Sequence, residues 1–336
     1  MEPSLRFLVV GLGSMGKRRI RNLRAIGGHE VAGFDVRTDR LREAHEKYSV
    51  PTFISYDAAL ASFRPDALIV STDPKNHLVY AESAAEVGVH CFIEASVLEP
   101  DAILELGRRI KPTDLVFAPS CTMKYFPMPR KILELVRAGS IGRSITFNYQ
   151  VGQYLPDWHP WESIHDYYVS RPETGGCREI LPFELTWLNS VFGFPRPLAC
   201  LRRKVTDLPV DIHDIYTCLL DYPNGVIGNV TIEVISRPTA TRQLLVLGSE
   251  GKLEFSNDTN VRYLKVGDKQ WTSFPLADMT IEQGYIYPEE PYIAELKDFI
   301  RAIDEGNRTI FPNTLDDDAR VLKLMGALEE LSRGTR

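Results

Sequence analysis

Three glycines spaced as G-x-G-x-x-G follow directly on a short apolar run near the start of the chain. They are Gly11, Gly13 and Gly16 in "GLGSMG", and a helix-like pattern, "KRRIRNLRAIG", comes next. Such a turn needs glycine because the chain bends tightly, a side chain would block a pyrophosphate, and the helix must approach the strand. The helix N-terminus then offers N–H donors and a positive dipole end to phosphate groups. The spacing predicts a dinucleotide site formed by Gly11, Gly13, Ser14, Met15 and Gly16.

An acidic residue, Asp35, stands about 20 residues after this turn, at the end of the second apolar run. A carboxylate there accepts hydrogen bonds from the adenosine ribose and would repel the 2′-phosphate of NADP. Arg37 and Arg40 follow closely and are able to receive such a phosphate. We therefore expect NAD as the cofactor, with NADP as the alternative.

The elements that would position this site fill the first part of the chain. Short apolar runs, among them "LRFLVV", "DALIVS" and "HCFIEAS", alternate there with amphipathic stretches. That alternation is typical of a parallel sheet covered by helices. We expect an α/β protein in which residues 1–122 form a Rossmann NAD(P)-binding domain.

The remainder, residues 123–336, has longer alternating runs joined by hairpin signals. These signals are Asn224-Gly225, Glu250-Gly251 and Gly267-Asp268. They predict an α+β domain with a large, open, mostly antiparallel sheet, used for substrate binding and oligomerisation. Helical spacing recurs in "PYIAELKDFIRAIDEG" and at 315–332, and the last helix has the option of packing back on the first domain.

Length, charge and cysteine content exclude several classes of protein. The 336 residues allow about two domains, and a net charge of -6 provides no basic surface for nucleic acid. No apolar run approaches the roughly 20 residues that a membrane-spanning helix needs. The cysteines show no C-x-x-C pair, so we expect reduced buried thiols, no metal site and a cytoplasmic protein. They are Cys91, Cys121, Cys177, Cys200 and Cys218.

The motifs and their order resemble the Gfo/Idh/MocA family of NAD(P)-dependent oxidoreductases over nearly the whole chain. "VSTDPKNHLVYAESAAEVGVHCFIEAS" parallels the family's T-P-x-x-x-H stretch and its E-K-P strand, and "MKYFPMPRKILELVRAGSIG" parallels its R-F-x-P helix. "GLGSMGKRRIRNL" resembles the branch associated with surface-polysaccharide and unusual-sugar biosynthesis. The resemblance adds Thr72, His77 and Glu94 to the expected cofactor site. It also implies homodimers or homotetramers that form through the second-domain sheet.

The chain departs from this family where its chemistry is expected. Ala95 replaces the lysine of E-K-P, and Ser96 replaces its proline. In the motif that reads G-G-x-x-x-D-x-x-H in relatives, Phe183 falls at the histidine, and Glu179 or Ile180 falls at the aspartate. Oxidation of an alcohol releases a hydride from carbon and a proton from oxygen, and neither alanine nor phenylalanine can accept that proton.

We therefore expect the acid–base group to have moved to another residue. The candidates are Lys124, His159, His165, Tyr167 and Glu179. We favour His165 as the proton-transfer group with Lys124 as its electrostatic partner, and His159 as the runner-up. Plainer interpretations stay open for these stretches. Lys124 would be a solvated charge, and Glu179 and Glu184 would be surface acids. The "WHPW" cluster, which contains His159, would pack within its loop rather than form a stacking platform for a sugar.

The expected function is that of an NAD(P)-dependent oxidoreductase acting on a sugar, sugar nucleotide or polyol through non-standard catalytic residues. Two alternatives stay open. One is a catalytically silent dinucleotide-binding sensor or partner subunit. The other is a non-redox elimination or hydrolysis on the same scaffold.

Overall fold

The computed structural model describes residues 4–96, 98–159, 162–257, 259–276, 279–285 and 287–333. The contacts within the chain divide it into two units. The first unit is Met1–Thr122 with Met279–Arg320, and the second unit is Met123–Asp278 with Val321–Arg336. The first unit thus continues beyond residue 122 with the separate segment 279–320. The reason is that helix α8 (Glu290–Asp304) packs against helix α1 (Ser14–Ile26), a contact that connects distant parts of the sequence.

The first unit contains a six-stranded sheet in which all neighbouring strands are parallel. Its order is β3-β2-β1-β4-β5-β6, the order of doubly wound dinucleotide-binding folds. The side chains of the central strands β1 and β4 are nearly all buried, as a sheet covered on both faces requires. The strands are β1 (Arg6–Val10), β2 (Glu30–Phe34), β3 (Thr52–Phe53), β4 (Ala67–Val70), β5 (His90–Ile93) and β6 (Phe117–Pro119).

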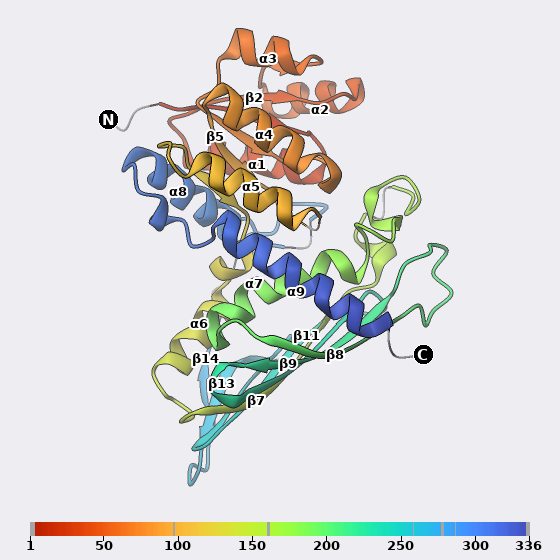
Figure 1. Cartoon of the computed structure of the whole chain (residues 1–336), viewed down its shortest axis with the longest axis vertical. Coiled ribbons are helices and arrows are strands. Elements are labelled where there is room, and N and C mark those ends of the chain that lie inside the picture. Colours follow the sequence, from red (N-terminus) through yellow and green to blue (C-terminus); the bar gives the residue numbers. More distant parts are fainter. Residues whose placement is uncertain are drawn as a thin grey trace. The chain divides into compact units, whose positions relative to one another are not determined.

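The helices of this unit alternate with its strands, because a parallel pair needs a crossover connection. Figure 1 shows them packed around the short strands. The short run Thr52–Phe53 and the helix that follows it lie outside the runs singled out in the sequence. Besides α1 and α8, the unit contains α2 (Thr38–Tyr48), α3 (Tyr56–Phe63), η1 (Pro74–Asn76), α4 (His77–Val87), α5 (Pro100–Ile110) and η6 (Arg308–Ile310).

The second unit contains an eight-stranded sheet in the order β14-β13-β12-β11-β7-β10-β9-β8. Only the neighbours β7 and β10 are parallel, so the prediction of a mostly antiparallel sheet is confirmed. All three predicted hairpins join successive strands. The strands are β7 (Ser144–Gly152), β8 (Arg196–Arg203), β9 (Ile215–Tyr222), β10 (Val226–Glu233), β11 (Thr241–Gly248), β12 (Gly251–Ser256), β13 (Thr259–Lys265) and β14 (Thr272–Phe274).

Helices α6 and α7 cover one face of this second sheet (Figure 1). Side chains that point toward them, such as Phe147 and Val230, are fully buried, while the alternate residues Asn148 and Asn229 are exposed. This alternation is that of an antiparallel sheet with one covered and one open face. The helices of the unit are η2 (Thr122–Tyr125), α6 (Pro127–Arg137), η3 (Leu155–Asp157), η4 (Tyr168–Ser170), α7 (Cys177–Phe192), η5 (Pro223–Gly225) and part of α9 (Leu315–Arg333).

Two further sequence expectations concern the whole chain. None of the helices in the described ranges is both long and apolar enough to cross a membrane. All five cysteines belong to these ranges; they are buried, and no disulfide joins them.

Candidate functional site

The glycine turn lies between β1 and α1, and two of its glycines are required by close backbone contacts. Gly11 has a φ of +90°, and a Cβ atom there would approach the carbonyl oxygen of Ser71 to 2.6 Å. A Cβ atom on Gly16 would overlap the carbonyl oxygen of Gly11. Gly13 differs, because its nearest neighbour would be the Arg40 guanidinium at 3.6 Å. The turn thus packs closely on its own backbone at Gly11 and Gly16 and leaves room beside Gly13.

Helix α1 begins at Ser14, with Met15 in its first turn and Gly13 as its N-cap. Gly13 has no side chain to cover the helix N-terminus. The first turn of a helix carries N–H groups without intrahelical acceptors and the positive end of the dipole. Together with the room beside Gly13, this arrangement fits the pyrophosphate of a dinucleotide.

Asp35 follows β2 and ties that strand to the glycine turn. Its Oδ2 accepts the backbone N–H of Leu12 at 2.7 Å, and its Oδ1 accepts the N–H of Arg37 at 2.9 Å. Only 4% of the residue is exposed. A carboxylate has about four lone-pair sites, so two backbone donors leave capacity for ribose hydroxyls. The residues present therefore fit the adenosine half of NAD.

The two arginines after β2 have different surroundings. The Arg37 guanidinium is exposed and pairs with Asp39 at 2.6 Å, which lowers the pKa of that carboxyl group to about 2. Arg40 lies on α2, with Nη1 3.7 Å from Oδ2 of Asp35. Of the two, Arg40 is thus the one beside the expected ribose site, and Arg37 is paired with an acid.

Thr72 and His77 belong to the segment that connects β4 to α4. The ring Nε2 of His77 lies 3.1 Å from the Thr72 carbonyl oxygen, a contact in which the ring N–H donates. His77 is buried, and burial lowers its pKa, so the ring is neutral at pH 7. Its Nδ1 is then an acceptor, and no partner for it occurs in the described ranges. The histidine holds this loop in place at the carboxyl end of β4.

Glu94 directly follows β5 and is held by a buried arginine on α1. Arg19, which is 0% exposed, donates to both carboxylate oxygens of Glu94 at 2.6 and 3.0 Å and to Oε2 of Glu295 at 3.0 Å. Ser71 also donates to Glu94, at 3.3 Å. Burial alone would lower the pKa of Arg19, but the two carboxylates outweigh it and raise that pKa. Glu94 therefore acts as a fixed ion-pair partner that orders the segment leading to Ala95.

The other carboxylate of this triad connects α8 to the end of β6. Glu295 accepts hydrogen bonds from the hydroxyls of Ser120 and Thr122 and from the N–H of Cys121, at 2.6–3.0 Å. Burial raises the pKa of Glu295, and the nearby Arg19 opposes that rise. The sequence showed no sign of this triad, because Arg19 reads as one of several surface-like charges in "KRRIRNLR".

Tyr285 is a second residue that the sequence did not single out. Its hydroxyl donates to the carbonyl oxygen of Ser14 at 2.7 Å. Its ring lies against the guanidinium groups of Arg18 and Arg21, 4.5 and 4.3 Å from the ring centre. Arg18 and Arg21 in turn both bond to Glu289. A segment from near residue 285 thus holds the start of α1, where a phosphate would bind.

The second unit contains a carboxyl group with unusual surroundings. Glu179 lies in the first turn of α7, and its Oε1 accepts the Tyr168 hydroxyl at 2.6 Å. Its Oε2 is shielded from solvent and has no partner among the residues described. Burial raises the pKa of Glu179 to about 7, against the opposing effect of the Tyr168 hydrogen bond. A carboxyl group with that pKa both accepts and returns a proton near neutral pH.

Aromatic side chains of the preceding loop lie close to this acid. The rings of Tyr167 and His159 stack with centres 4.6 Å apart, and His159 Nδ1 is 3.3 Å from Glu162. Burial raises the pKa of Tyr167, and Glu179 adds to the rise. Three of the five predicted catalytic residues, His159, Tyr167 and Glu179, therefore belong to one cluster. Trp158 precedes it, whereas Pro160 and Trp161 of the "WHPW" stretch lie outside the described residues.

The other two predicted catalytic residues also belong to the second unit. His165 is exposed, and its backbone N–H donates to Ser163. Lys124 is partly buried in η2. Their pairing as a proton-transfer group and an electrostatic partner stays a prediction.

Glu184 is the second carboxylate of α7, and the expectation of a surface position for it is wrong. It is 0% exposed and accepts hydrogen bonds from Tyr149, Trp187 and Arg242 at 2.6–3.0 Å. Tyr149 and Arg242 belong to the sheet, so this network fixes α7 on the covered face. Glu184 is buried because one turn separates it from Trp187, which faces the core.

The strand order and the glycine turn define the first unit as a Rossmann dinucleotide-binding unit. Comparison with protein families agrees. Residues 5–117 match the oxidoreductase family with an NAD-binding Rossmann fold, and residues 130–254 match the C-terminal domain of the same GFO/IDH/MocA family. The two matches together cover more than half of the chain, which therefore belongs to the Gfo/Idh/MocA family. No group of three or more potential metal ligands occurs within the described ranges.

Individual relatives support the same placement. The chain is 35% identical over 105 residues to the UDP-N-acetylglucosamine 3-dehydrogenase of Acidithiobacillus ferrooxidans, a match that covers 30% of this chain and only 32% of that relative. An oxidoreductase from Agrobacterium radiobacter, solved with NAD⁺, L-tartaric acid and magnesium, is 15% identical with a TM-score of 0.85, covering 99% of this chain and 97% of that one. The WlbA dehydrogenase of Bordetella pertussis, solved with NADH and UDP-GlcNAcA, is also 15% identical, with a TM-score of 0.78 and coverage of 98% and 97%. These structures show that the fold is shared along almost the whole chain.

Proposed function

We propose that the protein is an NAD-dependent oxidoreductase that acts on a CH–OH group of a sugar, sugar nucleotide or related polyol. The observation that carries the proposal is the glycine turn with Asp35 bonded to Leu12, which fits a dinucleotide. Membership of an oxidoreductase family supports the redox class. The sugar class is supported by the match to a UDP-N-acetylglucosamine 3-dehydrogenase.

The cofactor in this proposal is NAD in preference to NADP. Asp35 is buried and holds both backbone donors through its carboxylate, and a 2′-phosphate beside it would meet this negative charge. Arg37 is paired with Asp39 and would have to leave that partner to receive a phosphate. Arg40 alone would attract a 2′-phosphate only weakly, because its guanidinium already lies 3.7 Å from the carboxylate of Asp35.

Glu179 is the residue that we propose as the proton-transfer group. Bound NAD⁺ supplies the hydride acceptor, and the substrate carbon loses its hydride as the C–O bond becomes a carbonyl. The hydroxyl proton passes to the unpartnered Oε2 of Glu179, while the Tyr168 hydroxyl stays bonded to Oε1. A pKa of about 7 suits a base in this direction and an acid in the reverse. Glu179 thereby replaces the base that Ala95 and Phe183 cannot provide.

The loop before α7 would bind the substrate. Tyr167 stacked on His159 presents an aromatic surface, and the Nε1 of Trp158 is a buried donor for which the described residues provide no acceptor. Aromatic faces suit the apolar face of a sugar ring, and an indole N–H suits one of its hydroxyls. His165 and Lys124 stay as the rival proton-transfer pair.

The test of this function combines two measurements. Absorbance of the reduced cofactor is followed with a panel of sugar nucleotides and polyols, and NAD binding is measured by calorimetry without substrate. Turnover with at least one member of the panel supports the proposal, and a Glu179→Gln variant should then retain NAD affinity but lose turnover. NAD binding without turnover of any compound in the panel would favour the catalytically silent sensor. That alternative is argued from Ala95 and Phe183, which replace the family's usual lysine and histidine.

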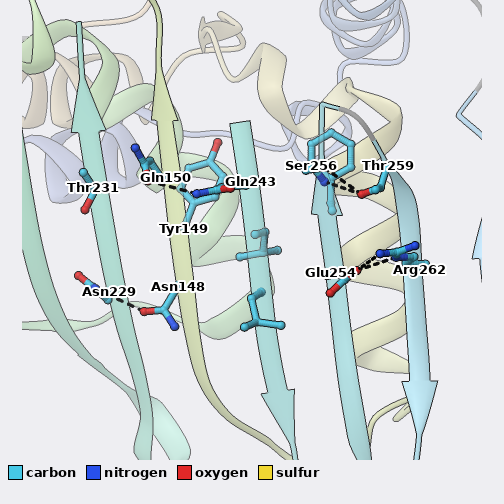
Figure 2. A pocket seen from close by; sticks show the side chains of 13 residues that line it. Asn148, Tyr149, Gln150, Asn229, Thr231, Gln243, Glu254, Ser256, Thr259 and Arg262 are labelled. Carbon is cyan, nitrogen blue, oxygen red and sulfur yellow. Dashed lines mark hydrogen bonds and ion pairs between the residues drawn. The ribbon is translucent and has the colours of Figure 1, made fainter. Parts of the chain in front are cut away.

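We also propose that two copies associate through the open face of the second-unit sheet. Its centre carries paired amides, Asn148 with Asn229 at 3.3 Å and Gln150 with Gln243 at 3.2 Å (Figure 2). Apolar side chains are exposed around them. These are Leu201, Leu219, Ile227 and Leu247. A polar centre bordered by exposed leucine and isoleucine on a broad sheet is suited to a second copy of the chain.

We further propose a cytoplasmic location, with which the buried, reduced thiols are consistent.

A further inference from the structure

The two halves of a dinucleotide occupy opposite sides of the point where the strand order reverses, which here lies between β1 and β4. Asp35 at the end of β2 marks the adenosine side, and the glycine turn after β1 marks the pyrophosphate. The nicotinamide half therefore belongs over the carboxyl ends of β4 and β5. The side chains at those ends are the ones available to recognise it.

The polar side chains directly after β5 are Glu94 and Ser96. Glu94 is neutralised by Arg19, which bonds to both of its oxygens. Ser96 is buried and bonds to the carboxyl group of Asp318, a residue in the first turn of α9. Asp318 thus comes from the far end of the chain to the loop that contains Ala95.

Asp318 is a buried acid whose carboxyl group is not fully hydrogen-bonded within the described residues. The residue is 7% exposed, and its Oδ2 has no partner among the described residues. An orphaned carboxylate oxygen in the interior costs free energy unless something binds it. Asp316, two residues earlier in the same turn, is exposed, so helix position alone does not require this burial.

We infer that Asp318 accepts a hydrogen bond from the carboxamide N–H of the nicotinamide, making it a recognition residue for that half of the cofactor. The inference rests on the proposed function only in requiring that NAD binds. It uses an oxygen without a partner at the edge of the sheet where the nicotinamide half belongs. Ser96, which bonds to the same carboxyl group, positions it.

Protonation makes this contact measurable. Burial raises the pKa of Asp318 to about 7; Asp317 of the same helix adds to the rise, and the Ser96 hydrogen bond from the loop after β5 opposes it. An ionised carboxylate accepts a hydrogen bond from an amide N–H more strongly than the neutral carboxyl group does, and it does so at either oxygen. Affinity for NAD⁺ should therefore increase, relative to a ligand without nicotinamide, as the pH rises through 7.

The experiment measures the affinities of the full chain for NAD⁺ and for ADP-ribose by calorimetry at pH 6, 7 and 8. The wild type should show a ratio of NAD⁺ to ADP-ribose affinity that rises several-fold across this range. Asp318→Asn should lower NAD⁺ affinity about tenfold and make the ratio independent of pH, with ADP-ribose affinity within about twofold of wild type. Asp316→Asn is the matched control and should behave as wild type. The 3-acetylpyridine analogue of NAD⁺, which lacks the amide N–H, should bind equally to wild type and Asp318→Asn.

Three outcomes would overturn the inference: an equal loss of both ligands in Asp318→Asn, no loss of either, or a flat wild-type ratio. The last needs no variant, so it decides the matter even if Asp318→Asn fails to fold. If neither NAD⁺ nor ADP-ribose binds to the wild type, the proposed function fails instead. If both ligands bind, and the ratio of their affinities depends neither on pH nor on the residue at position 318, only this inference fails.

Discussion

The carboxylate of Asp35 accepts the backbone N–H of Leu12 at 2.7 Å, so the acid after β2 and the glycine turn after β1 form one unit. The same side chain is expected to bind the adenosine ribose. Asp35→Ala removes both interactions, and NAD affinity should fall about 10- to 100-fold, the effect of losing hydrogen bonds to a charged group. Calorimetry with NAD and NADP measures this, and the gap between the two cofactors should narrow.

The control for Asp35 is Asp39→Ala, which removes an exposed acid bonded to Arg37. NAD affinity should stay within about twofold of wild type, because the exposed pair contributes little energy. NADP affinity should increase, since Arg37 is released to meet a phosphate. If Asp35→Ala bound both cofactors with unchanged affinity, Asp35 would not be part of the cofactor site.

Glu179→Gln is predicted to lower kcat for alcohol oxidation by about 10²- to 10⁴-fold, the usual contribution of a general base. In the wild type, the pKa of about 7 means that the carboxylate form grows as the pH rises through 7. kcat/KM for oxidation should therefore rise with pH and level off above about 8. Steady-state kinetics from pH 5.5 to 9 checks this, with His165→Ala as the comparison. A profile that keeps its shape in Glu179→Gln and disappears in His165→Ala would assign the base to His165.

The raised pKa of Glu179 also predicts how the free energy of unfolding depends on pH. Its contribution decreases as the pH rises, whereas an acid whose pKa is lowered by folding contributes more at higher pH. The pKa of Glu179 rises from an ordinary 4.5 to about 7 in the folded state, so folding favours its protonated form. That contribution is present below pH 4.5 and is lost as the pH rises through 7. Glu179→Gln, which stays neutral, should exceed the wild type in free energy of unfolding by about 1–3 kcal/mol at pH 8 and match it near pH 4. Urea unfolding at both values tests this, and an advantage that is equal at pH 4 and pH 8 would contradict it.

Arg19 is predicted to be critical for stability. Arg19→Met would leave Glu94 and Glu295 as buried carboxylates without a cation, at a cost of about 3–5 kcal/mol. Arg37→Met, at an exposed ion pair, should cost less than about 1 kcal/mol. Urea unfolding of both variants makes the comparison. If the two variants were equally stable, the buried triad would not hold the segment before Ala95.

The open sheet face is predicted to hold two copies together. Leu219→Arg places a charge among the exposed apolar side chains and should convert a dimer into a monomer at micromolar concentration, as measured by light scattering. Val266→Arg, at a position that is 82% exposed near a hairpin turn, is the matched control and should leave the mass unchanged. A wild type that is monomeric at this concentration would refute the proposal.

Much of the fold and of the cofactor site was predictable from the sequence, because both depend on local spacing. The glycine turn requires residues within one short stretch, and Asp35 is placed by the length of a single strand–helix–strand unit. Alternation along "GVIGNVTIE" likewise specifies a strand with one covered face, and Asn224-Gly225 specifies its hairpin. Such features are encoded within about 10–30 residues, so the order of residues reveals them.

The tertiary structure alone decided which charged and polar residues are buried, and with which partners. In the sequence, Arg19 resembles the neighbouring arginines, but in the structure it is buried and pairs with Glu94 and Glu295. Asp318 is likewise one of three consecutive aspartates in the sequence, but in the structure it is buried and bonds to Ser96 in the loop after β5. Glu179 and Glu184 lie on the same helix, yet one has an unpartnered oxygen and the other four donors. Burial and partners come from segments far apart in the chain, and they set the energy of a charge. Residue spacing therefore located the glycine turn and placed Glu179 among five candidate catalytic residues. Only the packed structure distinguished Glu179 from the other four and drew attention to Asp318.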